Sequence, residues 1–139
     1  MTPEQARRRF ASAAVARLAT AGADCQPHLV PIVFAVAGET IYSVVDAKPK
    51  RSTELRRLRN VESNPLVSVL VDHYDEDNWD ALWWVRADGS ARVLSLDEPE
   101  AARAVELLAP RYPQQRPLGP VLAIDVKRWS GWAARERSL

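Results

Sequence analysis

The chain has 139 residues and a formal net charge of +1; 47% of its residues are hydrophobic and 27% are charged. This length predicts one domain over residues 1–139, and the apolar content suffices for a core and excludes a disordered chain. The five glycines, at positions 22, 38, 89, 119 and 131, are too far apart for a dinucleotide-binding Gly-x-Gly-x-x-Gly turn or a P-loop. Two common ways of binding a nucleotide through backbone amides are therefore excluded.

Cys25 is the single cysteine, so the chain has no internal disulfide and no cysteine cluster for zinc or iron–sulfur. The first ten residues are charged and lack the apolar centre of a signal peptide, and no run reaches the roughly 18 apolar residues of a membrane span. We expect a soluble, cytoplasmic protein with no membrane partner.

The N-terminal segment predicts a helix that begins after Thr2. Thr2 is an N-cap candidate, Pro3 suits the first helical position, and Gln5 completes a capping box. After Ala14 the run at 15–20 is typical of a short strand, and the segment 21–27 contains turn residues.

Two strands are predicted next, over 28–36 and 40–46. The first is a nearly continuous apolar run that Pro31 interrupts, which favours an edge strand or a bulge with backbone groups available to a ligand. Gly38 and Glu39 turn the chain between the two strands, so we expect them to form a hairpin.

A helix capped by Ser52 or Thr53 should follow, with an apolar stripe through Leu55, Leu58 and Val61. The pair at 64–65, Asn-Pro, should end it, and 66–74 reads as a strand.

The segment 81–96 predicts either one long strand bulged at Gly89 or a hairpin that turns at Asp88-Gly89. Asp97 is expected to cap the last helix, which Pro110 ends. A proline-rich loop at 111–120 and a strand at 121–129 complete the chain.

These elements amount to about six strands with two or three helices, joined mostly by short turns. The pattern predicts a mainly β (α+β) fold, a six-stranded antiparallel sheet or small barrel with peripheral helices, and not a parallel α/β sheet.

The charges are strongly segregated along the chain. Residues 48–59 hold six cations and one acid, Glu54, whereas residues 72–80 hold five acids and no lysine or arginine. The cations are Lys48, Lys50, Arg51, Arg56, Arg57 and Arg59, and the acids are Asp72, Asp75, Glu76, Asp77 and Asp80.

This basic tract has three interpretations. With Ser52, Thr53 and the free amides of a helix start, it suits a phosphate or carboxylate ligand. It is equally compatible with a solvated helix face whose arginines pair with the acidic segment. Nucleic acid is disfavoured because no aromatic residues are interleaved with the cations.

Five tryptophans form the second signal, at positions 79, 83, 84, 129 and 132. Trp83 and Trp84 must point to opposite faces of a regular strand. One can enter the core, and the other needs intramolecular cover, a second subunit or a ligand ring.

Side chains for catalysis are scarce. His73 lies beside Asp72 and Asp75, but alternation along a strand sends these side chains in mixed directions, so we predict no metal site. Cys25 and His28 in a turn are not a credible nucleophile pair, and no Gly-x-Ser-x-Gly motif is present. We therefore predict no catalytic side chain and expect a cofactor to supply the chemistry.

Several segments resemble one known family. These are VARLAT, QPHLVPIVFAV, TIYSVVDAKPKR, LRRLRN followed by NP and VSVLVDHYDED, and LWWVRADGSARVL. Over residues 13–132 the sequence resembles the pyridoxamine-phosphate-oxidase-like split β-barrel proteins, and within them the actinobacterial branch that uses the deazaflavin coenzyme F420. The C-terminal arginines and histidine with which pyridoxamine phosphate oxidase itself binds substrate are missing, which argues against vitamin B6 oxidation.

The resemblance implies a homodimer with two cofactor sites between the subunits, where a flavin-like ring lies against the strand at 28–33 and a phosphate lies in the basic tract. The implied cofactor-binding residues are His28, Val30, Pro31 and Ile32, then Ser43 and Val45, then Lys48, Lys50, Arg51, Ser52, Arg57, Arg59 and Asn60, and Trp79 or Trp83 of the partner subunit.

The charge count bears on the choice of cofactor. FMN carries one phosphate, whereas coenzyme F420 carries a phosphodiester and several carboxylates, so six cations favour the longer polyanion. We therefore predict an F420-dependent oxidoreductase that passes a hydride to a small organic substrate. The alternatives are an FMN-binding flavoprotein of the same fold and a non-enzymatic carrier of F420 or flavin.

Overall fold

The computed structural model describes residues 1–45, 52–116 and 119–135. Within these residues the helices are α1 (Pro3–Ala11), α2 (Ser52–Ser63), α3 (Pro99–Leu108) and the short 3-10 helix η1 (Trp79–Ala81). The strands are β1 (Ala16–Ala21), β2 (Pro27–Ile32), β3 (Ala35–Ala37), β4 (Thr40–Val44), β5 (Leu66–His73), β6 (Trp83–Leu94) and β7 (Val121–Ala133). No helix in the described part of the chain is long and apolar enough to cross a membrane.

Helix α1 begins as its sequence predicts. The backbone N–H of Gln5 donates to the Thr2 hydroxyl at 3.1 Å, and the backbone N–H of Thr2 donates to the Gln5 side chain at 2.8 Å. This capping box satisfies two amides that a helix start leaves without partners. The end of α2 before Asn64 is also confirmed, whereas the predicted caps Ser52 and Thr53 are the first two residues of the helix itself.

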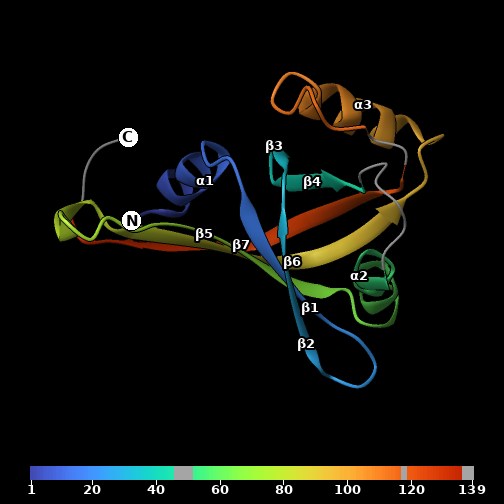
Figure 1. Ribbon diagram of the computed structural model, residues 1–139, viewed down its shortest axis with the longest axis horizontal. Coiled ribbons are helices and arrows are strands. Elements are labelled where there is room, and N and C mark those ends of the chain that lie inside the picture. The colour runs from blue at the N-terminus through green and yellow to red at the C-terminus, as the bar shows by residue number, and fades with distance from the viewer. Residues whose placement is uncertain (46–51, 117–118, 136–139) are drawn as a thin grey trace.

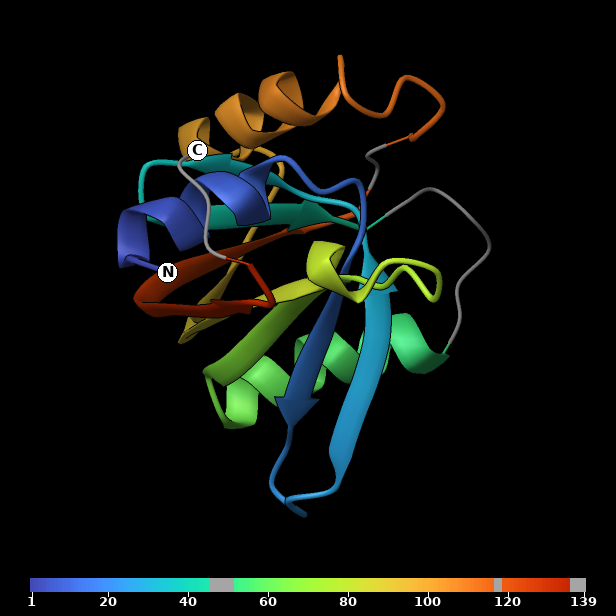
Figure 2. The ribbon, with the colours of Figure 1, turned by 90° about the vertical axis from the view of Figure 1, so that its left-hand side faces the viewer.

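The described strands form one curved antiparallel sheet in the order β2-β1-β5-β6-β7-β4-β3. The long strands β6 and β7 lie near its middle, with β1 and β2 turning away on one side and β3 and β4 on the other (Figures 1 and 2). The expected antiparallel, mainly β fold is confirmed, with seven strands in place of six.

The extra strand arises because the run at 28–36 divides, and the hairpin predicted from it is partly wrong. Strand β2 pairs with β1, while only β3 forms a hairpin with β4. Between β2 and β3 the ring of Phe34 is fully buried, 4.9 Å from the ring of Phe10. The Arg111 guanidinium donates to the Phe34 carbonyl at 2.7 Å. Anchoring this residue in the core interrupts the strand and sends its two halves to opposite edges of the sheet.

Strand β6 is a single strand with a bulge, which decides between the two interpretations of 81–96. The register to β7 shifts between Asp88 and Gly89. A Cβ atom on Gly89 would lie 2.3 Å from the backbone oxygen of Asp125, so only glycine fits this crossing.

The predicted cap of the last helix is wrong. Helix α3 begins at Pro99, with Glu98 at the N-cap position and no side-chain capping bond. The Asp97 carboxylate is engaged by the Ser95 hydroxyl instead, and the fixed φ of proline starts the helix two residues later than Asp97. Strand β7 also runs past the predicted end at 129, because its last residues pair with the start of β6.

Two apolar clusters lie on opposite sides of the sheet. The larger one fills the barrel between the inward side chains of the strands, α1 and α2, and includes Phe10, Phe34 and Trp129. The smaller one packs α3 against β3, β4 and the start of β7, with Leu108 and Tyr42 among its members.

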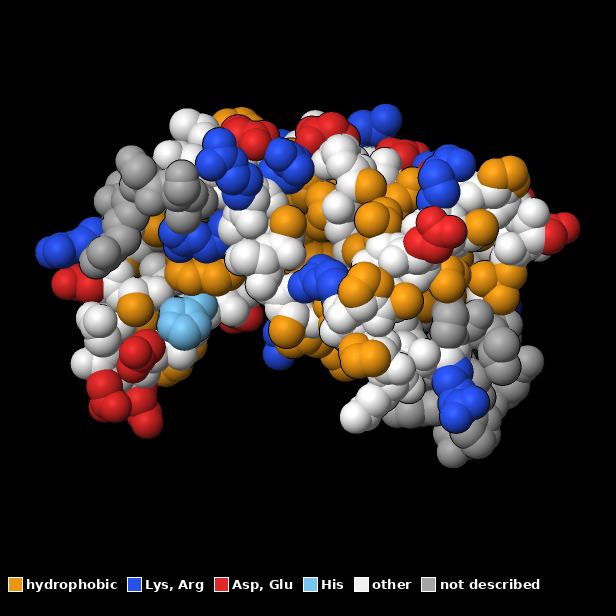
Figure 3. Space-filling model, turned by 90° about the horizontal axis from the view of Figure 1, so that it is seen from above, with side chains coloured by type: hydrophobic (Ala, Val, Ile, Leu, Met, Phe, Trp, Pro, Cys, Tyr) orange, Lys and Arg blue, Asp and Glu red, His pale blue; other side chains and the backbone are white. Residues whose placement is uncertain are grey.

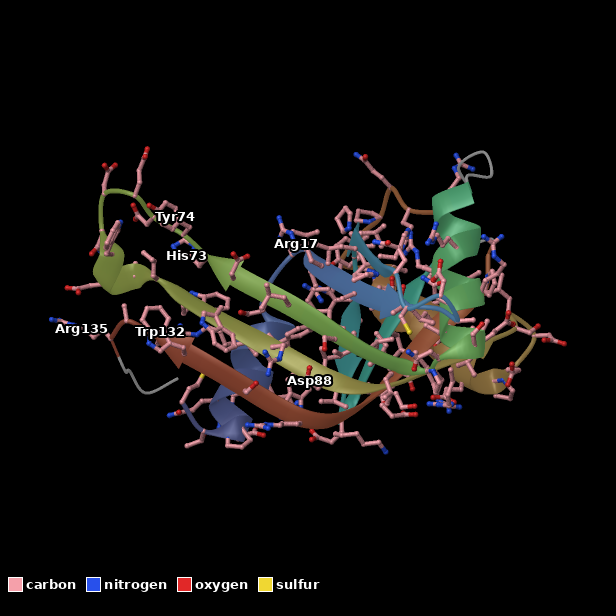
Figure 4. All side chains as sticks on the ribbon, turned by 90° about the horizontal axis from the view of Figure 1, so that it is seen from below. Arg17, His73, Tyr74, Asp88, Trp132 and Arg135 are labelled. Atoms are coloured by element: carbon pink, nitrogen blue, oxygen red, sulfur yellow. The ribbon has the colours of Figure 1, made fainter. Side chains whose placement is uncertain are left out.

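Outward side chains of β5, β6 and β7 are left exposed beyond α3. Along β5, valines 67, 69 and 71 point inward and are buried, while the residues between them point outward. We call the outward side of this region the open face, and it appears in Figure 4, which looks at the molecule from below. Its residues are Arg17, Leu66, Ser68, Leu70, Asp72, Trp84, Arg86, Asp88 and Trp132.

A polar network ties α3 to the sheet. The Arg92 guanidinium donates to Glu100 at 3.0 Å and to Asp125 at 2.7 Å, and the Tyr42 hydroxyl donates to Glu100 at 2.7 Å. These hydrogen bonds, first those from Arg92 and then that from Tyr42, lower the pKa of Glu100 to about 2. Four elements, β4, β6, α3 and β7, therefore meet at one charged cluster.

We expect Gly89→Ala to destabilise the fold by about 1–3 kcal/mol, because the new methyl group meets backbone that cannot move without breaking the β6–β7 ladder. Urea unfolding measures the loss, and Ser90→Ala at the next position serves as the control. A change below about 0.5 kcal/mol would contradict the close crossing.

Stability should also fall in acid because of Glu100. Its pKa is lower in the folded protein than the ordinary 4.5, so its contribution is complete above pH 4.5 and is lost as pH falls toward 2. Between pH 6 and 3 the wild type should lose about 1–2 kcal/mol more unfolding free energy than Glu100→Gln, after allowance for solvent screening. Equal losses in urea titrations of both proteins would show that the network carries no such linkage.

Candidate functional site

The predicted edge strand is confirmed. Within the described ladders β2 pairs only with β1, so its other side has no neighbouring strand. Pro31 is exposed at this edge, whereas Ile32, at 4% exposure, points into the core. Val30 also packs against the core. A ligand at this edge would therefore meet backbone and Pro31, and not the Ile32 side chain.

Helix α2 is fixed on the hairpin of β1 and β2 by a buried amide. The side-chain N–H of Asn60 donates to the Thr20 hydroxyl at 3.0 Å, and both residues are buried. Gly22 allows the close approach, because a Cβ there would lie 2.5 Å from the Asn60 oxygen. Asn60, a predicted cofactor residue, thus positions the basic helix through its Nδ2 atom.

His28 lies opposite Thr20 in the register of β1 and β2, on the side that α2 covers. Its Nδ1 atom is buried and has no hydrogen-bond partner among the described atoms. Burial, and then the charges of Arg56 and Arg57, lower the pKa of His28 below 6.5. The ring is therefore neutral at pH 7 and has hydrogen-bonding capacity that the fold does not use, which suits a polar ligand.

The next feature is the set of cations on α2, the helix that packs on the β1–β2 hairpin. Arg56 forms an ion pair with Asp24 of the β1–β2 loop at 3.8 Å, and Arg59 is exposed. Lys48, Lys50 and Arg51 lie outside the described residues, as does the side chain of Ser52, although Ser52 is the first residue of α2. Within the described part, Asp72 and Asp80 pair with Arg17 and Arg135, and not with this helix.

The end of β4 approaches the end of β2. The buried Ser43 hydroxyl donates to the Val33 carbonyl at 2.9 Å, next to Ile32. Val45 exchanges backbone hydrogen bonds with Pro120 and Gly119, at 3.1 and 3.2 Å. The structure thus brings the predicted ring-flanking residues to one end of the edge strand, with the Ser43 hydroxyl already engaged.

The two candidate tryptophans differ in accessibility. Trp83 points inward, with the Arg9 guanidinium 5.0 Å from its ring and the His73 ring stacked at 6.3 Å. Trp79 is 66% exposed on η1, at the end of the molecule opposite α2 (Figure 1). Trp79 can therefore contact another molecule, and it would reach an α2 site only from a second copy.

Trp84 and Trp132 are functional candidates that sequence reasoning did not assign to the site. They lie opposite each other in the register of β6 and β7, on the open face, which confirms that Trp83 and Trp84 point to opposite sides. With Leu70 and Tyr74 they line a hollow of about 390 Å³. The adjacent pair Trp83 and Trp84 indicated that one tryptophan would lie on the outward side. Its neighbour Trp132 was missed because the last strand was predicted to end at 129.

Comparison with known proteins gives the family. The family model described as pyridoxamine 5'-phosphate oxidase matches residues 2–133. No curated protein matches the chain.

Solved structures share the fold. A conserved protein of Mycobacterium tuberculosis is 27% identical, with a TM-score of 0.70, over 100% of this chain and 92% of its own. A FAD-binding protein of Mesorhizobium loti is 21% identical, with a TM-score of 0.72, over 94% of each chain. The haem storage protein of Vibrio cholerae is 18% identical, with a TM-score of 0.68, over 96% of this chain and 95% of its own. The same fold therefore occurs in proteins that bind different large planar cofactors.

The environment of His28 predicts its titration. We expect an NMR pKa below 6.5 in the folded protein, which rises when Arg56 and Arg57 are both replaced by Gln, because two positive charges no longer oppose protonation. The rise should be partial, since burial is the larger cause. Arg103→Gln on α3 is the control, and an unchanged pKa in the double variant would place α2 farther from His28.

Proposed function

Because the chain belongs to the pyridoxamine 5'-phosphate oxidase family, we propose that it is an oxidoreductase that binds coenzyme F420 between two subunits. It would pass a hydride from this deazaflavin to a small organic substrate. The observation that carries the proposal is the basic helix α2 packed on β1, next to the edge strand β2, whose His28 has a buried Nδ1 atom with no hydrogen-bond partner among the described residues.

The residues present fit such a cofactor. Arg57, Arg59 and the cations of 48–51 would hold its phosphate and carboxylates, with the first amides of α2 adding donors. The edge of β2 near Val30 and Pro31 would lie along the ring. His28 in its neutral form would supply one hydrogen bond at the ring or its side chain, and the partner's Trp79 would cover the site.

The work of the protein at this site is positioning. A bound deazaflavin or flavin supplies the hydride chemistry, so no acid or base of the chain is required for that step. The rigid pair of β1 and β2, fixed to α2 through Asn60 and Thr20, holds the binding groups in one arrangement. Orienting the reactants in this way can lower a barrier by several kcal/mol.

A homodimer is part of the proposal. Trp79 lies on η1, at the end of the molecule opposite α2, and its side chain is exposed (Figure 1). A second copy would provide it.

Two alternatives have their own support. The FAD-binding relative from Mesorhizobium loti and a similar FAD-binding protein of Mycobacterium smegmatis, 21% identical with a TM-score of 0.66 over 94% of this chain and 93% of its own, favour an FMN-binding flavoprotein. The haem storage protein favours a carrier that binds its cofactor without turnover. A carrier would bind tightly yet reduce no member of a panel of enones, quinones and nitroaromatics.

Titration with coenzyme F420 and with FMN, followed by tryptophan fluorescence, tests the proposal. We expect quenching by the deazaflavin with a Kd below about 100 μM, and weaker binding of FMN because it offers fewer anionic groups to the cations. Tighter binding of FMN, with a yellow protein as purified, would favour the flavoprotein, and no binding of either would refute the proposal.

Charge reversal locates the anion site. Arg59→Glu should raise the Kd for the deazaflavin at least about tenfold, because an attraction becomes a repulsion at the helix. Arg103→Glu makes the same change on exposed α3 and should leave the Kd unaltered. Equal effects of the two variants would show that only overall charge matters.

A further inference from the structure

Another hollow lies at the end of the molecule opposite α2, on the inward side of the sheet. This end is the tip, which is the connection between β5 and β6 at residues 74–82. The hollow has a volume of about 340 Å³, and α1, η1 and the ends of the long strands form its walls. We call it the tip hollow, and the lining residues with polar or aromatic side chains that matter here are Arg9, His73, Asp80, Trp83 and Arg135. A space of this size can hold a small organic molecule.

A stack of flat side chains forms one wall of the tip hollow. The Arg9 guanidinium carbon lies 5.0 Å from the centre of the Trp83 ring. The His73 ring is inclined by 20° to the same ring, with 6.3 Å between the two centres. A guanidinium that rests on an aromatic face keeps its N–H donors in its own plane, pointing away from the ring.

The donors of Arg9 are not used by the fold. Within residues 1–45, 52–116 and 119–135, the Arg9 side chain makes no hydrogen bond and no ion pair. Phe10, the next residue of α1, is fully buried and holds this helix on the sheet. Arg9 is therefore fixed in position by packing, while its hydrogen-bonding groups remain available at the hollow.

A second guanidinium comes from the residues that follow β7. The backbone N–H of Ala134 donates to the Leu82 carbonyl at 2.8 Å, which fixes the end of β7 beside the tip. Arg135 therefore lies at the same end of the molecule as His73 (Figure 4). Its guanidinium is 3.7 Å from the Asp80 carboxylate, and both side chains are more than half exposed. An ion pair this long and this exposed is weak, so a bound anion can compete for Arg135.

We propose that the tip hollow binds a small planar carboxylate, an aromatic or conjugated acid, at a site separate from the cofactor site at α2. Without counting His73, the lining carries two guanidinium groups and one carboxylate, and so has one positive charge in excess. A carboxylate matches this charge and can accept two parallel N–H bonds from a guanidinium. The exposed ring of His73 and the ring of Trp83 offer a flat wall on which a planar ligand can stack.

The surroundings of the hollow favour a ligand that makes close contacts. Figure 3 shows basic side chains, a histidine and apolar surface together on the lobe that ends in acidic side chains. Those acids, at 75–77, are exposed and repel anions at longer range. Inorganic phosphate has no flat face to stack, so the charge alone should not hold it there. Packing of Arg9 over Trp83 as a mere cover would explain their contact, but not the second guanidinium beside it.

Titration with benzoate in the absence of cofactor tests the tip hollow. The readout is the NMR signal of the Trp83 indole N–H, which Trp83→Phe identifies among the five tryptophans. We expect a saturable shift with a Kd on the order of 1 mM, as is usual for so small a ligand. Benzamide, which is flat but uncharged, and cyclohexanecarboxylate, which is charged but not flat, should each bind at least about fivefold more weakly.

Three results of this titration would overturn the proposal. Equal affinity for benzamide would refute recognition of the charge, and equal affinity for cyclohexanecarboxylate or inorganic phosphate would refute recognition of a planar acid. The absence of saturation by about 20 mM benzoate would refute the site itself.

Replacement of the two arginines locates the bound carboxylate. Arg9→Gln and Arg135→Gln should each raise the benzoate Kd at least about fivefold, because each removes charged donors. Arg8→Gln is the matched control, since Arg8 precedes Arg9 on α1 but pairs with Glu4, and it should leave the Kd unchanged. Circular dichroism checks the fold, and Arg135 is exposed beyond the last strand, so its loss cannot act by unfolding the protein. An unchanged Kd in both test variants, or an equal rise in the control, would contradict the assignment.

Arg59→Glu separates the tip hollow from the cofactor site. This change on α2 should weaken binding of the deazaflavin, as predicted above, and leave the benzoate Kd unaltered. A benzoate Kd that rises in Arg59→Glu but not in Arg9→Gln would place the acid at α2 and overturn the proposal. Because the benzoate titration contains no cofactor, failure of the protein to bind the deazaflavin would leave its result standing.

Discussion

The pairing of β6 with β7 is the constraint on which the other elements depend. These two strands are the longest in the sheet, and they contribute to both apolar clusters. The bulge at Gly89, where the backbone of Asp125 comes too close for any side chain, divides the pair into two regions. Beyond the bulge in the direction of Leu94, α3 covers the outward side. Toward Trp83, the same side is the open face.

The two regions of the β6–β7 pair are stabilised by different contacts. At the α3 end, the network of Arg92, Glu100, Asp125 and Tyr42 lies over apolar packing, so polar and apolar contacts both hold the helix. At the tip end, the inward side is packed against α1 through Phe10 and Trp129, whose rings are 5.3 Å apart, while the outward side remains exposed. At this end of the sheet the inward side chains are packed within the chain, whereas apolar side chains on the outward side remain exposed.

The candidate site lies at the edge of the sheet that β2 forms. Pro31 keeps β2 at an edge, and the buried bond between Asn60 and Thr20 fixes α2 against β1. Together they place arginines beside a neutral histidine whose Nδ1 atom has no partner in the described structure. This combination explains why a chain without a glycine-rich phosphate loop can still offer an anion site: side-chain cations and a helix start replace backbone amides.

The amino-acid sequence by itself determined the local elements, because their signals are short-range. The capping box at Thr2, the helix stop at Asn64-Pro65 and the alternation along β5 each depend on residues a few positions apart. Pro31 within the apolar run at 28–36 indicated the edge strand, and the resemblance identified the family. Only the tertiary structure decided what depends on distant contacts. The burial of Phe34 against Phe10 split one predicted strand in two, and the engagement of Asp97 by Ser95 moved the start of α3. The pairing of Trp84 with Trp132 placed two tryptophans on one exposed face. Charge segregation was visible in the sequence, but its meaning required the fold, because only the arrangement of the strands places the acidic tip and the basic helix at opposite ends of the molecule.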